Sequence, residues 1–224
     1  MAKGILYGVG VGPGDPELMT LKAVKTALHC DLIAVPRKER EKCTALKIAL
    51  GAAPALAGKP LLTVDMPMTK DAVVLEESYR KGAALLESEL VQGKNVCFLT
   101  LGDPTVYSTY MYLHQRVSAD GYPTAIVPGV TSFCAAAAAL GIPLCENQKQ
   151  LHIIPGTYTP TEALNLPGVK VMMKNNLPAT LRALRQSGAS AAMVENCGMK
   201  NEKIYRKLDE IPEDAGYFSL LIVK

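Results

Sequence analysis

Apolar runs alternate with amphipathic segments through the first half of the chain, and this order predicts strands that are followed by helices. Short apolar runs bounded by turn residues are typical of buried strands, whereas apolar residues three or four apart mark one face of a helix. The predicted strands are residues 5–11, 32–35, 61–64 and 96–101, and the predicted helices are residues 16–28, 37–50, 73–92 and 107–117. This alternation indicates an α/β fold with a mostly parallel sheet, in which ligands bind at the loops that follow the strands.

The second half of the chain has the same kinds of element in a less regular order. Turn residues at 121–123 place the boundary between residues 116 and 124, and we expect domains at 1–118 and 119–224. The predicted strands are residues 124–127, 151–154, 169–173, 191–194 and 217–223, and the predicted helices are residues 133–140 and 177–187. The later strands are spaced like hairpins, so part of the second sheet is expected to be antiparallel.

A glycine-rich loop follows the first predicted strand. Glycine occupies every second position from Gly8 to Gly14, and Pro13 or Asp15 stands where a dinucleotide fingerprint G-x-G-x-x-G needs its third glycine. The Gly-Lys-Ser/Thr of a P-loop is also absent. Pro13 has no N–H to offer a phosphate, and the carboxylate of Asp15 would repel one. The loop therefore indicates an uncharged or cationic ligand, with a strand-to-helix turn that binds nothing as the alternative.

Composition excludes several classes of protein. The 224 residues have a net charge of +3, only three Phe and no Trp, so we expect no nucleic-acid partner. Six cysteines are scattered without a C-x-x-C pair, which indicates reduced thiols in a cytoplasmic protein and no metal site. We recognise no signal peptide and no apolar run of about 20 residues, so no membrane partner is expected.

Three loops that are rich in glycine and proline each follow an apolar strand, at residues 12–16, 101–104 and 128–132. Together they resemble the tetrapyrrole methylase family, in order and over essentially the whole chain. Leu101 stands where that family often has the first glycine of a Gly-Gly-Asp loop. Longer stretches are similar to the branch of the family that methylates carbon 20 of precorrin-2 or cobalt-factor II: residues 101–113, 128–137, 194–199 and 217–223.

The resemblance implies two α/β domains of the tetrapyrrole methylase type with the cofactor cleft between them. The N-terminal domain would lie on the tetrapyrrole side, and the C-terminal domain would complete the site for S-adenosylmethionine, which leaves as S-adenosylhomocysteine. Family members are typically homodimers. The positions that match the family's cofactor contacts are Pro13, Leu101, Gly102, Asp103, Val106, Thr131, Ser132 and Met173. The sulfonium of this donor carries a positive charge and no phosphate, which agrees with the chemistry of the first loop.

Four of these positions also have a purely structural interpretation. Asp103 could form an Asx turn before Pro104. Thr131 and Ser132 could cap the helix that follows them. Met173 could belong to the core, and Lys174 beside it is charged where some family members have glycine.

The tetrapyrrole is a wide macrocycle with carboxylate arms, and it needs basic groups and hydroxyl groups around it. We expect Arg37 to pair with a substrate carboxylate, with an ordinary solvated charge run as the alternative. Tyr107 and Tyr110 could offer hydroxyls, although tyrosines at helical spacing also pack in cores. Methyl transfer to carbon is an in-line displacement that depends mainly on positioning. No catalytic residue can be named from the sequence, because the histidines are too dispersed to suggest a triad.

Other functions stay open at this point. The chain could methylate another corrin carbon or a siroheme precursor, or it could bind its ligands without catalysis. A nicotinamide dehydrogenase is disfavoured by the broken dinucleotide fingerprint.

Overall fold

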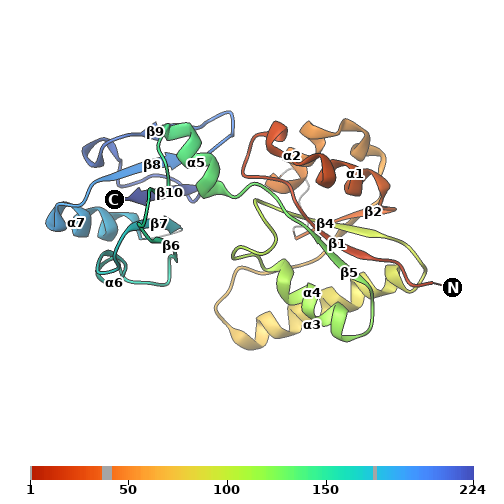
Figure 1. Ribbon diagram of the computed structural model, residues 1–224. Coiled ribbons are helices and arrows are strands. Elements are labelled where there is room, and N and C mark those ends of the chain that lie inside the picture. The colour runs from red at the N-terminus through yellow and green to blue at the C-terminus, as the bar shows by residue number, and fades with distance from the viewer. Residues whose placement is uncertain (1, 37–41, 174–175) are drawn as a thin grey trace. The chain divides into compact units, whose positions relative to one another are not determined.

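The computed structural model describes residues 2–36, 42–173 and 176–224. Its contacts divide the chain into Met1–Thr131 and Ser132–Lys224, called here the first and the second unit. Each unit contains its own sheet (Figure 1).

The sheet of the first unit has the strand order β3-β2-β4-β1-β5, and all of its neighbouring strands are parallel. Its strands are β1 (Leu6–Gly10), β2 (Leu32–Val35), β3 (Leu61–Thr63), β4 (Val96–Thr100) and β5 (Thr124–Val127). These elements confirm the predicted strands to within one or two residues, and they confirm the parallel sheet.

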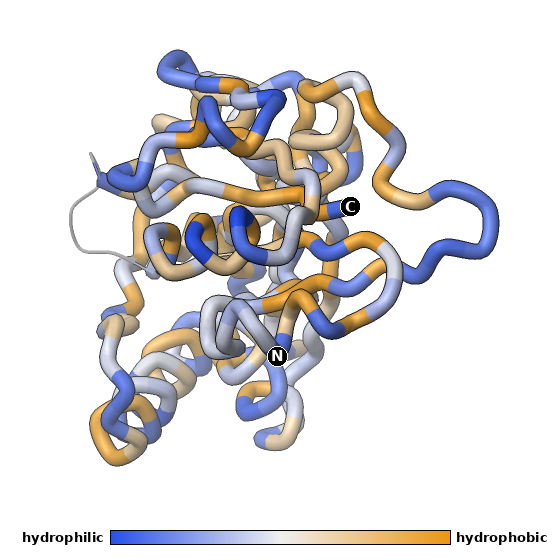
Figure 2. Tube along the Cα trace, turned by 90° about the vertical axis from the view of Figure 1, so that its left-hand side faces the viewer, coloured by the Kyte–Doolittle hydropathy of each residue, from blue (hydrophilic) through white to orange (hydrophobic). Residues whose placement is uncertain are grey.

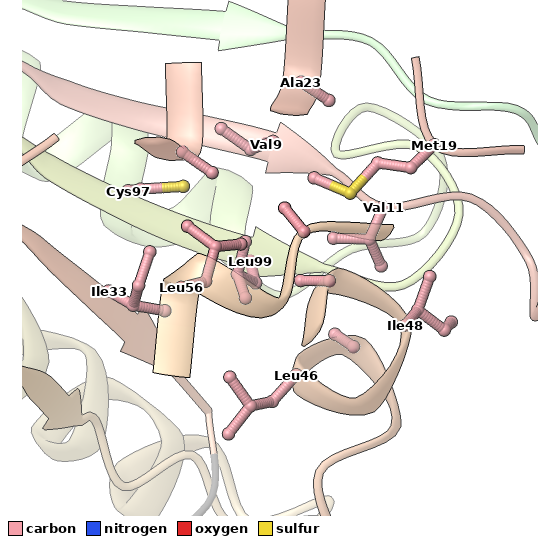
Figure 3. Packing of buried hydrophobic residues seen from close by; sticks show 14 of the residues in the cluster. Val9, Val11, Met19, Ala23, Ile33, Leu46, Ile48, Leu56, Cys97 and Leu99 are labelled. Atoms are coloured by element: carbon pink, nitrogen blue, oxygen red, sulfur yellow. The ribbon is translucent and has the colours of Figure 1, made fainter. Parts of the chain in front are cut away.

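Helices cover the first sheet on two faces, and each face has its own apolar cluster. The helical elements are η1 (Pro16–Leu18), α1 (Leu21–His29), α2 (Thr44–Ala52), η3 (Pro54–Gly58), α3 (Ala72–Leu90) and α4 (Tyr110–Ala119). Val9, Ile33 and Leu99 pack against α1, α2 and η3 (Figure 3). Leu6, Ala34 and Phe98 point to the other face, toward α3 and α4. Polar and apolar stretches follow one another along the helices, as their amphipathic patterns predict (Figure 2).

Three predicted helices of the first unit begin later than the pattern suggested; of the helix predicted over 37–50, α2 starts at Thr44. The carboxylate of Asp15 accepts a hydrogen bond from Glu17 N at 2.9 Å and caps only the short η1. The hydroxyl of Thr20 then accepts from Ala23 N at 3.1 Å, and α1 starts there. Helix α4 starts at Tyr110 instead of residue 107, because Tyr107 has a φ of 48° and lies outside the helical region.

The sheet of the second unit is mixed, with the order β6-β7-β10-β8-β9. Its strands are β6 (Leu151–Pro155), β7 (Val169–Met173), β8 (Ala191–Glu195), β9 (Lys203–Tyr205) and β10 (Ser219–Val223). Strands β6 and β7 are parallel, and the other pairs are antiparallel, which confirms the expectation of a partly antiparallel sheet. The helical elements are α5 (Ser132–Leu140), α6 (Pro160–Leu164), α7 (Leu177–Ser187) and η4 (Leu208–Glu210).

The division of the chain differs from the predicted domains 1–118 and 119–224. Strand β5 pairs with β1 in parallel, with Leu6 opposite Thr124, so it completes the first sheet instead of opening a second one. The units consequently divide after Thr131, at the start of α5. The turn at 121–123 joins α4 to β5 within the first unit.

Membrane-spanning helices and metal-binding clusters are both absent from the described residues. None of their helices combines the length and the apolar character that a membrane crossing requires. In the same part of the chain, no cluster of three or more His, Cys, Asp or Glu side chains could hold a metal ion.

Candidate functional site

The carboxyl ends of β4, β1 and β5 lie side by side, and the three glycine-rich loops leave the sheet there. We call residues 10–15, 100–105 and 127–131 the three-loop junction. Gly102 N donates to Gly12 O at 2.8 Å, and Gly12 N donates to Gly102 O at 3.3 Å. Val11 N donates to Thr100 O at 2.9 Å. The first and second loops are therefore joined by a short extension of the sheet beyond β1 and β4.

The side chain of Asp103 joins the second loop to the third. One carboxylate oxygen, Oδ2, accepts from Gly129 N at 2.9 Å, and Oδ1 accepts from Thr105 N at 2.8 Å and from the Thr105 hydroxyl. The residue is only 8% exposed. Burial alone would raise the pKa of the Asp103 carboxyl, but the hydrogen bonds from Thr105 and Gly129 outweigh it and hold the pKa below its ordinary value. Asp103 thus forms the Asx turn and also binds the third loop through Gly129 N.

The glycines of the three-loop junction allow its backbones to touch. A Cβ on Gly129 would stand 2.1 Å from Gly102 O, and a Cβ on Gly10 would stand 2.7 Å from Gly129 N. Side chains at these two positions would collide with backbone atoms, which cannot rotate away. Two residues before Gly10 in β1, a Cβ on Gly8 would lie 2.0 Å from the ring of Tyr110. Part of the glycine pattern therefore serves packing within the first unit.

Gly102 differs from Gly10 and Gly129 in the space around it. Its φ is +69°, and a Cβ added there would meet no atom within 4 Å. Open space thus borders the second loop next to Asp103. Thr131 Oγ1 is buried and has no hydrogen-bond partner among the described residues. A buried hydroxyl without a partner is costly, and a ligand that accepts or donates a hydrogen bond would relieve that cost.

The structure brings together the predicted donor contacts of the first unit. Pro13 is buried in the first loop, Leu101 and Val106 are half-buried around Gly102 and Asp103, and Thr131 ends the third loop. The other two predicted contacts lie in the second unit, where Ser132 begins α5 and Met173 ends β7. A cofactor cleft between two domains stays a prediction.

The second unit contains a cavity of about 140 Å³ that the sequence interpretation missed. Met172, Leu177 and Leu221 form its apolar walls, and the loop 215–219 contributes Gly216, Tyr217 and Ser219. Met172 precedes the predicted contact Met173. The stretch 217–223 resembles the C(20) branch, but nothing in its residue types indicates a cavity.

The predicted substrate contacts have different outcomes. Tyr107 follows the second loop and is 53% exposed. Tyr110 is 1% exposed, packs on Phe98 and shares a hydrogen bond of 3.1 Å with His114 Nδ1, so its hydroxyl is a core group. This corrects the expectation that Tyr110 offers its hydroxyl to a substrate. Arg37 lies outside the described residues, and so does Lys174.

The proteins to which this chain is similar carry closely related names. The chain is 34% identical over 233 residues to the precorrin-2 C(20)-methyltransferase of Sinorhizobium sp, covering 98% of this chain and 95% of that protein. It is also 34% identical over 225 residues to the probable cobalt-precorrin-2 C(20)-methyltransferase of Methanocaldococcus jannaschii, with coverages of 98% and 95%. The uroporphyrin-III C-methyl transferase of Thermus thermophilus, solved in complex with S-adenosylhomocysteine, has a TM-score of 0.68 at 25% identity, with 98% of this chain and 97% of that chain covered.

The family of tetrapyrrole (corrin/porphyrin) methylases matches residues 5–212, a range that holds all three loops of the junction and most of the second unit. From this match, and from relatives that are similar over nearly their whole length, the chain belongs to the tetrapyrrole (corrin/porphyrin) methylases.

Proposed function

We propose that this chain is an S-adenosylmethionine-dependent methyltransferase that methylates carbon 20 of precorrin-2 or cobalt-factor II in cobalamin biosynthesis. The observation that carries the proposal is its similarity over nearly the full length to proteins named as C(20)-methyltransferases. As for family members in general, we propose that it works as a homodimer in the cytoplasm, and light scattering of the purified protein tests the dimer.

The residues of the three-loop junction fit a donor that lacks phosphates. The Asp103 carboxylate is engaged by three hydrogen-bond donors, so it contributes negative charge from a fixed position. Open space lies beside Gly102, and the buried Thr131 hydroxyl offers a hydrogen bond to a polar ligand. We propose that Pro13, Leu101, Gly102, Asp103, Val106 and Thr131 border the donor in the first unit, and that Ser132 and Met173 contribute from the second.

We propose that the cavity of the second unit binds the flat purine of the donor. Met172, Leu177 and Leu221 give it apolar walls, and Tyr217 and Ser219 add residues with hydroxyl groups to its lining. An apolar pocket with a few polar groups is the usual setting for a small flat ligand, because burial supplies affinity and the polar groups set orientation.

In this proposal the protein acts mainly by positioning. S-adenosylmethionine supplies a methyl group on a positively charged sulfur, which is already activated for in-line displacement. Hydrogen bonds among Gly12, Gly102, Asp103 and Gly129 hold the three-loop junction rigid, so little freedom remains to be lost when substrates bind. Such positioning can lower a barrier by about 7–11 kcal/mol in favourable cases.

The test of the proposed function is a methylation assay with isotope-labelled S-adenosylmethionine. We expect the label at carbon 20 of precorrin-2 or of cobalt-factor II, with one S-adenosylhomocysteine formed for each methyl group transferred. Label at another carbon would identify a different corrin methylase. If neither tetrapyrrole promoted formation of S-adenosylhomocysteine, the chain would be a binding module and the proposal would be wrong.

We also propose that Tyr107 contacts the macrocycle. It stands at the carboxyl end of the sheet, directly after the second loop, in a left-handed conformation (φ 48°) that a tyrosine rarely adopts. Such strain costs about 1–2 kcal/mol and persists where function requires a fixed direction. Tyr107→Asn suits the same φ, so we expect unchanged or slightly higher stability together with a KM for the tetrapyrrole raised about tenfold.

Steady-state kinetics and thermal denaturation of this variant measure both effects. Tyr158→Asn is the control, because Tyr158 is equally exposed but lies in the second unit, after β6. If Tyr107→Asn lost stability and kept the KM of the wild type, Tyr107 would serve the fold and not the substrate.

A further inference from the structure

Glu195, at the end of β8, holds one wall of the cavity in the second unit, and we propose that it is a positioning residue for donor binding. The proposal rests on the proposed function and deepens it. Glu195 lies in the stretch 194–199, which resembles the C(20) branch and to which no role has so far been assigned. The residue does not line the cavity; it acts through the loop 215–219, which does.

The contact between Glu195 and this loop is direct. Gly216 N donates to Glu195 Oε1 at 2.8 Å, and a Cβ on Gly216 would stand only 3.0 Å from that oxygen. Two further hydrogen bonds hold the same loop: Asn196 N donates to Phe218 O at 2.9 Å, and Ser219 Oγ donates to Gly216 O at 2.7 Å. The loop is therefore fastened to β8, with Glu195 as its only buried anionic anchor among the described residues.

The surroundings of Glu195 do not favour a buried carboxylate, so a contribution to folding stability does not explain its position. The residue is 7% exposed, and its Oε2 has no hydrogen-bond partner among the described residues. Lys203 Nζ stands 3.7 Å from Oε2, on a side chain that is 63% exposed, where water screens the attraction. Burial of a carboxylate with so few partners is unfavourable, so its one short hydrogen bond points to a role at the cavity wall.

From this geometry follows a specific requirement on side-chain chemistry. The Gly216 N–H needs an acceptor at the position of Oε1, and the negative charge is secondary. Gln supplies such an acceptor on a side chain of the same length. Ala supplies none, and Asp is one methylene too short to reach. If the hydrogen bond to Gly216 is what matters, the Gln variant should keep its affinity for the donor, whereas the Ala and Asp variants should lose affinity.

The experiment is isothermal titration of the full chain with S-adenosylhomocysteine, together with thermal denaturation of each variant. We expect Glu195→Ala and Glu195→Asp to weaken binding about tenfold, as expected for loss of a hydrogen bond to a charged group. Glu195→Gln should bind within about threefold of the wild type. Lys203→Met, the control for the ion pair, should bind like the wild type.

Each other outcome overturns the proposal. Wild-type affinity in Glu195→Ala would show that the loop needs no anchor, and Glu195→Gln as weak as Glu195→Ala would assign the effect to charge. Should Glu195→Ala fail to fold, the comparison of Glu195→Gln with Glu195→Asp carries the same test. A wild-type chain that binds no S-adenosylhomocysteine contradicts the proposed function itself, which separates the two failures.

Discussion

Replacement of Gly129 by alanine should abolish methyl transfer and lower the unfolding free energy by roughly 3 kcal/mol or more. The added Cβ would stand 2.1 Å from Gly102 O and 2.9 Å from the backbone of Gly10, so the three loops could no longer touch. The loops must separate to make room, because the atoms that the Cβ would meet, Gly102 O and Gly10 C and Cα, all belong to the backbone. Urea denaturation measures the stability, and titration with S-adenosylhomocysteine measures donor binding.

Gly58→Ala is the matched control for this substitution. A Cβ at Gly58 would meet nothing within 4 Å, and its backbone is not left-handed. We expect a change within about 0.5 kcal/mol and full donor binding. A Gly129→Ala variant that behaved like Gly58→Ala would mean that the loops are not held in contact.

Replacement of Asp103 by asparagine should lower the unfolding free energy by about 2 kcal/mol and weaken donor binding about tenfold. Asp103 accepts hydrogen bonds on both oxygens, from Thr105 and from Gly129. An amide has only one acceptor oxygen, so its NH₂ must face a donor whichever way it is turned. Asp15→Asn is the control, because Asn caps the short η1 as well as Asp does, and only a few tenths of a kcal/mol should be lost.

The effect of Asp103→Asn should depend on pH in one direction. The pKa of Asp103 is lowered on folding from its ordinary value of 3.8, so its contribution is fully present above that value and is lost as the pH falls through the folded-state pKa. The stability difference between wild type and variant should therefore be constant near neutral pH and shrink below about pH 4. A difference that persisted in acid would contradict the assignment to the carboxylate.

Much of the fold could be predicted because local patterns and tertiary structure agree. The apolar runs at β2, β4 and β7 are too short and too apolar for most structures other than a buried strand. The order of strands and helices then predicts a parallel first sheet. The boundary between the two units could not be predicted, because the turn at residues 121–123 looks the same within a domain as between two domains. Only the pairing of β5 with β1 shows that β5 belongs to the first sheet. Strand β9 was missed since it is short and largely exposed.

The short α6 was also missed, although its signal was readable. Thr159 and Glu162 form a capping box, and Pro160 occupies the first helical turn.

The candidate site was predicted in its loops but not in its internal contacts. Motif resemblance selected all three loops of the first unit, and the structure joins them. The link from Asp103 to Gly129 spans segments that local patterns cannot relate. The same limit applies to the cavity, whose walls come from β7, α7, β10 and the loop before β10. It also applies to Tyr110, whose burial depends on the absence of a side chain at Gly8.

The position of β1 in the middle of the first sheet also sets when the site can form. Its two neighbours, β4 and β5, pair through Val96 and Thr124, far from Leu6 along the chain. Contacts between such distant segments form slowly, and proteins are synthesised from the N-terminus. On the ribosome, β1 therefore stays without either partner strand until β4 and then β5 have been synthesised. Donor binding can stabilise the first unit against unfolding only after both strands have paired with β1.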